Sequence, residues 1–318
     1  MPAPRPANLA ALGMILVYAT VIGFTDNFVR VIAADAGLWQ FHATRSTLAC
    51  LIVGLAAGPL ALRIRPLNPA AVARRSLIHA VAMVIYFGSL AFLPVAVAAA
   101  GLFTAPIFVL IFSRFVYGQR IGPFRILAVA TGFAGVLLVL GLGQGALPGP
   151  ATALPVAAGA LYALGNIATR QWCEGESPLT LATGFFVALG LLGLAGMAVL
   201  ALWRPEVPPG AAGFVLRGFV WPQPPEFWFW TLVQAAGSLA GVGLMIRAYQ
   251  TGEASRIAVF EYAILPMSAF WTWILWGDGL GALQWLGMAL IVLAGAIILL
   301  RGARAGAGRS VRGGDAAA

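Results

Sequence analysis

A succession of long apolar segments limits the folds that this chain can adopt. Each is about 20 residues long, the length that an α-helix needs to cross ~30 Å of hydrocarbon at 1.5 Å per residue. Since the bilayer interior offers no hydrogen-bond partner to the backbone, such segments cross it as helices. The sequence therefore predicts an all-α membrane protein with ten transmembrane helices, over residues 9–31, 38–61, 76–94, 97–116, 124–142, 151–171, 180–203, 227–249, 254–276 and 281–300.

Composition excludes a soluble domain. The 318 residues are 61% hydrophobic and only 9% charged, too few charged side chains to cover a water-exposed surface. The formal charge of +9 would suggest a nucleic-acid partner in a soluble protein. Here the basic residues lie in short segments between apolar runs, so they report topology and we expect no nucleic-acid partner.

The arginines predict the orientation in the membrane. Basic residues near helix ends stay on the cytoplasmic side. With the N-terminus inside, only Arg30, Arg204 and Arg217 fall in outer segments, while Arg45 lies inside the membrane. Most tryptophans then fall at outer helix ends, where their amphipathic rings favour the interface. Both termini are therefore predicted to be cytoplasmic.

The two halves of the chain repeat one passage. A proline, Pro106 or Pro266, precedes a glycine at a helix end, Gly118 in the first half and Gly277 in the second. Five helices per half is an odd number, so the second half must be inserted upside down, as in transporters whose substrate site lies near the midplane. The predicted units are 1–145 and 146–302, followed by a disordered basic cytoplasmic tail over 303–318.

These passages resemble a known family. The stretches LAFLPVAVAAAGLFTAPIFVLIFSRFVYGQRIGPFRILAVATGFAGVLLVL and AYQTGEASRIAVFEYAILPMSAFWTWILWGDGLGALQWLGMALIVLAGAIILL resemble the two EamA repeats of the drug/metabolite transporter (DMT) superfamily. The resemblance implies a ten-helix carrier in a bacterial inner membrane, commonly an exporter of amino acids or other small metabolites. The family usually has an acid after the glycine that closes the fourth and ninth helices; this chain has Gln119 and Asp278.

Charged residues at bilayer depth cost at least ~2.5 kcal/mol, so they are the first site candidates. Asp26 and Arg45 share a predicted depth of about 10 Å and form either an ion pair or a substrate or proton site. The alternative is a structural pair between Asp26 and Arg30, one turn along the same helix. His42, beside Arg45, is a candidate for proton exchange or for a structural hydrogen bond.

Polar residues at helical spacing mark further candidate helix faces. Tyr162, Asn166 and Arg170 are spaced i, i+4, i+8, so they share one face. Such a stripe suits a cavity wall or interhelical hydrogen bonds. Asn27 is the candidate counterpart of Asn166 in the first half, Gln234 has the same two interpretations, and His79 is expected at the inner interface.

Glu261 and Tyr262 are the most informative pair. Glu261 lies about two turns inside its predicted helix, where a low dielectric disfavours the charged carboxylate and suits a proton carrier. The alternative is a salt bridge with Arg247 or Arg256. Pro106 and Pro266 leave the carbonyls four residues back without a donor and are candidate hinges. Predicted aromatic cavity walls are Tyr86, Tyr162, Tyr262 and Trp271.

The predicted function is secondary active transport of a small metabolite, an amino acid or a related polar or aromatic compound. Export by alternating access is expected, with proton coupling as an option. Alternatives are import of a nucleoside-like metabolite such as S-adenosylmethionine, and a passive channel or structural membrane subunit. An enzyme is not expected, because H-E-x-x-H and G-x-S-x-G are absent. No cofactor or metal is predicted; the expected partners are the substrate, the bilayer and, as an option, a second copy.

Overall fold

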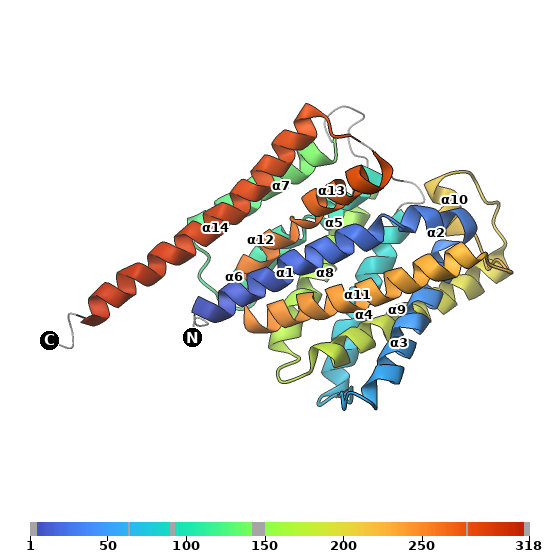
Figure 1. Ribbon diagram of the computed structural model, residues 1–318, viewed down its shortest axis with the longest axis horizontal. Coiled ribbons are helices and arrows are strands. Elements are labelled where there is room, and N and C mark those ends of the chain that lie inside the picture. Colours follow the sequence, from blue (N-terminus) through green and yellow to red (C-terminus); the bar gives the residue numbers. More distant parts are fainter. Residues whose placement is uncertain are drawn as a thin grey trace.

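The computed structural model describes residues 5–62, 64–89, 93, 95–141, 150–277 and 279–314 (Figure 1). Over this range the chain forms helices and no strand. The helices are α1 (Arg5–Asp26), α2 (Val29–Asp35), α3 (Leu38–Ala57), α4 (Pro69–Ser89), α5 (Val95–Leu102), α6 (Ala105–Phe115), α7 (Pro123–Val139), α8 (Ala153–Gln171), α9 (Pro178–Trp203), α10 (Ala211–Leu216), α11 (Pro225–Thr251), α12 (Ala254–Glu261), α13 (Ile264–Trp276) and α14 (Ala282–Gly314), with a 3-10 turn over Pro150–Thr152.

Within the described residues, eight helical segments are long and apolar enough to cross a membrane, so the chain is a multi-pass membrane protein. They are Leu9–Asp35, Pro69–Ser89, Val97–Phe115, Pro150–Gln171, Pro178–Trp203, Pro225–Thr251, Ala254–Trp276 and Ala282–Leu300. The other two predicted spans correspond to α3 and α7. Helix α3 has 20 residues but contains Gln40, His42 and Arg45, and α7 is apolar but has 17 residues.

Three of these spans are broken within the membrane. Helices α1 and α2 are separated at Asn27 and Phe28, α5 and α6 at Phe103 and Thr104, and α12 and α13 at Tyr262 and Ala263. The last two breaks follow from Pro106 and Pro266. Proline has no N–H to donate and clashes with the preceding turn, so α5 stops four residues before Pro106 and α12 five residues before Pro266.

The helices pack in a few dominant pairs. Helix α1 packs on α11 and α13, α4 on α8, α8 on α5 and α6, and α3 on α9. Figure 1 shows α7 and α14 paired along one edge of the molecule. Two glycines permit this close approach: a Cβ on Gly135 would lie 2.5 Å from the carbonyl oxygen of Gly287. Larger residues there would separate the two backbones.

Two predictions concern the ends of helices. Helix α14 continues to Gly314, beyond the expected start of a disordered tail, because its earlier turns are already formed and each further residue adds one hydrogen bond. Residues 315–318 lie outside the described residues, as does Asp278, so the contrast of Asp278 with Gln119 stays a prediction. Gly118 and Gly277 both adopt positive φ, +62° and +71°, where their helices end.

Candidate functional site

Glu261 is the last residue of α12 and is only 5% exposed. Its Oε1 accepts hydrogen bonds from the Tyr249 hydroxyl of α11 and from Asn166 Nδ2 of α8, the latter at 3.2 Å. Arg256, one of the two arginines considered as its partner, instead contacts Glu253 at 2.9 Å. Among the described residues, no basic side chain forms an ion pair with Glu261. The carboxyl is therefore held by neutral donors.

Helices α1, α4 and α8 complete what we call the Glu261 cluster: Glu261, Tyr249, Asn166, His79, Tyr162 and Tyr18. His79 Nε2 lies 3.0 Å from Asn166 Oδ1. The Tyr162 hydroxyl donates to Met245 Sδ at 3.0 Å and lies 3.4 Å from the Tyr18 hydroxyl. The expectation that His79 is interfacial is wrong, because His79 is 2% exposed and hydrogen-bonded inside the helix bundle.

A second group, the Asp26 cluster, comprises Asp26, Gln234, Arg45, His42 and Ser238. Gln234 of α11 donates to Asp26 Oδ1 at 2.7 Å and accepts from Arg45 at 3.3 Å and from Ser238 at 2.6 Å. Arg45 also lies 3.3 Å from His42 Nδ1. Gln234 thus joins Asp26 to Arg45, where the sequence had suggested a direct ion pair. Arg30, the other predicted partner, lies 3.6 Å over the Trp276 ring.

The two charges of the Asp26 cluster differ in exposure. Asp26 is exposed at the end of α1, whereas Arg45 is 8% exposed and surrounded by α3 and α11. A molecule approaching this cluster therefore meets a carboxylate. A buried guanidinium bonded to an amide and beside an imidazole acts mainly on the network that positions the acid.

Several predicted site residues instead hold helices together. Asn27 donates to the carbonyl of Gly23 at 2.6 Å and accepts from Thr272 at 2.6 Å, which ties α1 to α13. Trp271 Nε1 donates to the carbonyl of Thr20 at 3.2 Å across the same helix pair. Tyr262 is fully buried, with its ring against Gly132 of α7.

Tyr86 of α4 belongs to an aromatic group near the Asp26 cluster. Its ring centroid lies 4.8 Å from that of Phe87, which in turn lies 4.9 Å from the His42 ring. Trp230 stacks on Phe28 at 3.7 Å, next to the break between α1 and α2. Flat apolar surfaces thus accompany the carboxylate of Asp26.

We expect Gln234→Leu to destabilise the protein by about 2 kcal/mol, because it leaves the buried Arg45 and Ser238 without their shared acceptor. The unfolding temperature in detergent should fall by several degrees. Thr231→Val is the matched control, since Thr231 lies one turn earlier on α11, is fully buried and has a hydroxyl with no hydrogen-bond partner in the described part of the chain. Equal unfolding temperatures for the two variants would show that the bridge contributes little.

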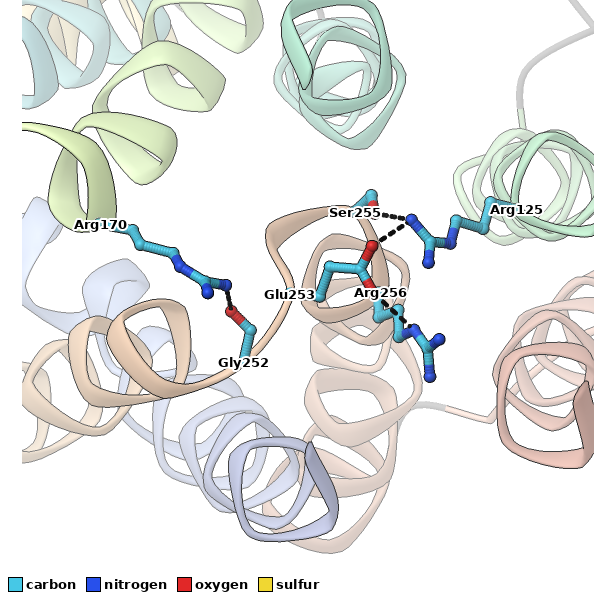
Figure 2. Close-up of polar contacts among 6 residues, drawn as sticks. All are labelled: Arg125, Arg170, Gly252, Glu253, Ser255 and Arg256. Atoms are coloured by element: carbon cyan, nitrogen blue, oxygen red, sulfur yellow. Dashed lines mark hydrogen bonds and ion pairs between the residues drawn. The ribbon is translucent and has the colours of Figure 1, made fainter. Parts of the chain in front are cut away.

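At the opposite end of the bundle, the connection between α11 and α12 is held by arginines (Figure 2). Glu253 forms ion pairs with Arg125 of α7 and Arg256 of α12, and Arg125 also donates to Ser255 Oγ at 2.8 Å. Arg170 of α8 donates to the carbonyl oxygen of Gly252. We call these six residues the Glu253 latch. Arg170 therefore does not share the role of Tyr162 and Asn166, although all three lie on one helix stripe.

The chemistry of these groups suits binding and proton exchange. Carboxyl, hydroxyl and amide groups bind protons and hydrogen-bonding solutes. In the part of the chain that the structure describes, no three His, Cys, Asp or Glu side chains gather as metal ligands. Cys50 and Cys173 are free thiols.

Comparisons with known proteins indicate which family this chain resembles. The EamA-like transporter family matches residues 9–141. A riboflavin transporter of Rhizobium johnstonii is 29% identical over 232 residues, 71% of this chain and 68% of that protein. The pseudopaline exporter CntI of Pseudomonas aeruginosa is 28% identical over 228 residues, 69% of this chain and 71% of its own. These matches support the placement of this chain in the EamA family of the DMT superfamily.

Further relatives agree with this assignment. A riboflavin transporter of Vibrio cholerae is 26% identical to this chain over 199 residues, which are 62% of this chain and 60% of that protein. A crystal structure matches this chain with a TM-score of 0.71 at 19% sequence identity. The match covers 93% of this chain and 98% of that protein, and it supports the fold alone. The protein is a membrane-embedded transporter of a small molecule and not an enzyme.

Proposed function

We propose that this EamA transporter is a secondary active carrier that exchanges a proton at Glu261 for movement of a small polar or aromatic metabolite. The observation that carries the proposal is a carboxyl buried within a membrane span and held by Tyr249 and Asn166, with no ion pair to any residue that the structure describes. Neutral donors stabilise the carboxylate less than an arginine would, so the protonated form remains accessible. An intramembrane acid of this kind is typical of proton relays in transporters.

Alternating access is proposed on the basis of a ten-helix inverted repeat. In such a repeat, α1/α2, α3, α4, α5/α6 and α7 correspond in order to α8, α9, α11, α12/α13 and α14. The contact of α1 with α11 then corresponds to that of α8 with α4, and α1 with α13 to α8 with α6. The α3–α9 and α7–α14 contacts map onto themselves, as expected for a two-fold axis in the membrane plane. The proline breaks and the two positive-φ glycines also correspond.

The two ends of the bundle are proposed to open in turn. Ala11 of α1 lies against Gly252, so the Glu253 latch is at the end of the bundle where α1 begins. We assign this end to the cytoplasmic side of an inner membrane. Asp26 is exposed toward the other end. The structure then corresponds to a state closed inside by the latch and accessible outside. The break at Tyr262 lies between the short α12 and α13 and is the proposed hinge.

Riboflavin is our first candidate substrate and aromatic amino acids are the second. Three relatives carry the name riboflavin transporter, and an exposed carboxylate beside Tyr86 and Phe87 suits a flat molecule with hydrogen-bond donors. Export is the proposed direction, as in the name of the CntI relative. Uptake of a nucleoside-like compound in the same fold is the alternative direction and substrate.

The test is transport by purified protein in proteoliposomes. Labelled riboflavin or tryptophan should accumulate against its gradient when a pH difference is imposed, and should exchange saturably without one. The direction of the pH difference that drives accumulation separates export from import. Equilibration without accumulation and without saturation would identify a passive channel and reject the proposal.

Pro266→Ala should lower the turnover rate about fivefold, since it permits a hydrogen bond worth about 1 kcal/mol that closes the break between α12 and α13. The substrate concentration that gives half-maximal transport should stay the same. Transport kinetics in proteoliposomes give both values. Pro205→Ala, in the connection after α9, is the control. Unchanged turnover in Pro266→Ala would mean that the break is static.

A further inference from the structure

We propose that His79 is the positioning residue of the Glu261 proton site, which it controls through the orientation of the Asn166 carboxamide. This inference rests on the proposed function, because it explains how the proton-binding carboxyl is tuned. His79 does not touch Glu261. Its Nε2 lies 3.0 Å from Asn166 Oδ1, and Asn166 Nδ2 lies 3.2 Å from Glu261 Oε1.

The direction of the amide decides its effect on Glu261. With Oδ1 toward His79, the NH₂ group of Asn166 donates to the carboxyl and stabilises the ionised form. After a half-turn of the carboxamide, Oδ1 would face Glu261 and repel the carboxylate. A proton on His79 Nε2 selects the first orientation, because only a donor can pair with Oδ1.

The His79 ring is held in a site built to its shape. A Cβ on Gly165 would lie 2.1 Å from His79 Nδ1, so only glycine at this position of α8 leaves room for the ring. The rings of Tyr162 and Phe185 approach it edge-on, with centroids at 5.3 and 6.3 Å. Nδ1 lies 3.3 Å from the carbonyl oxygen of Arg75, to which it cannot donate when the neutral ring carries its proton on Nε2, so packing and Asn166 hold the ring. The ring therefore cannot turn away from Asn166 without displacing α8 or α9.

The surrounding charges favour a neutral imidazole. Arg75, one turn earlier on α4, is 1% exposed and donates to Thr169 Oγ1 at 3.0 Å and to the carbonyl of Leu181 at 3.2 Å. A second positive charge on His79 would repel this guanidinium. The ionisable side chains nearest Glu261 are tyrosines: Tyr249 of α11 donates to its carboxylate, and Tyr162 of α8 lies 3.4 Å from Tyr18 of α1 in the same cluster.

The experiment follows the protonated carboxyl of Glu261 by infrared difference spectroscopy of the full-length protein in lipid, titrated with pH. The band that disappears in Glu261→Gln belongs to Glu261. In His79→Leu, the Glu261 carboxylate should lose one hydrogen-bond donor, which should raise the midpoint of its titration by about one pH unit. Gly165→Ala should act in the same direction by displacing the ring, although it changes no ionisable group. His79→Gln, whose amide can donate from the position of Nε2, should restore the midpoint.

The outcomes separate this inference from the proposed function. A Glu261 band whose midpoint is the same in wild type, His79→Leu and Gly165→Ala would overturn the positioning role and leave the proton site intact. A spectrum with no band that Glu261→Gln removes would overturn both. An upward shift that His79→Gln fails to reverse would assign the effect to altered packing and reject the positioning role as well.

Discussion

Glu261→Gln is expected to abolish accumulation driven by a pH gradient while leaving substrate exchange in place. Glutamine keeps the size of the side chain and can still accept from Tyr249 and Asn166, but it cannot carry a proton. A gradient of one pH unit supplies 1.36 kcal/mol per proton, enough to concentrate a substrate about tenfold. The accumulation ratio in proteoliposomes should therefore fall from about ten to about one.

Glu174→Gln is the matched control for this experiment, because Glu174 is exposed in the connection after α8 and lies outside both clusters. It should accumulate substrate as the wild type does. Counterflow measured without a pH gradient shows whether the Glu261→Gln variant is folded and binds substrate. If Glu261→Gln accumulates substrate as the wild type does, with the same pH dependence, the proton-carrier role is wrong.

Glu253→Gln is expected to open the end of the bundle that the Glu253 latch closes. Glu253, Arg125 and Arg256 have partly buried side chains, with 29%, 17% and 28% exposure, so each ion pair should contribute about 0.5 kcal/mol. Loss of both pairs should raise the ratio of open to closed molecules about fivefold. Helix α12 connects the latch to Glu261, so the opening should also expose the inner part of this helix.

The opening can be measured with a thiol introduced by Ala258→Cys, one turn beyond the latch and 1% exposed, after Cys50→Ser and Cys173→Ser. A membrane-impermeant maleimide added from the latch side should label it about fivefold faster with Glu253→Gln. Glu226→Gln, at the start of α11 on the other side, is the control. Labelling at the same rate in both variants would show that the latch does not hold this end closed.

The sequence was informative where one residue type dominates a local interaction. Apolar runs predicted the membrane spans, and eight described segments meet both the length and the hydropathy that a span requires. Pro106 and Pro266 predicted where two helices break, because a missing N–H acts within its own turn. The predicted inversion of the two halves and the cytoplasmic location of the termini remain proposals.

The polar clusters were predicted less completely, because each is assembled from distant segments. Glu261, Asn166 and Tyr162 were selected as polar residues at membrane depth, and they do lie together. Tyr249 was overlooked because a tyrosine near a helix end is usual at the interface. His79 was misplaced for the same reason. Its burial depends on Gly165, which makes room for the ring but lies on another helix.

Similar reasoning explains the residues that do not reach the clusters. Tyr262 follows Glu261 directly, but the helix ends between them and turns its ring toward α7. Arg170 shares a helix stripe with Asn166, yet its long side chain reaches the end of α11. Helical spacing predicts a shared face, while side-chain length and breaks in the helix decide which neighbours are contacted.

The amino-acid sequence is enough to identify a multi-pass helical membrane protein and to locate two helix breaks, because these properties depend on hydropathy and on the backbone of one segment. The donors that hold Glu261, the bridge by which Gln234 joins Asp26 to Arg45, and the closure of one end by Arg125 and Glu253 emerge from the three-dimensional packing. Those contacts are made between helices far apart in the chain. Their partners are chosen by packing, which a single helix does not encode.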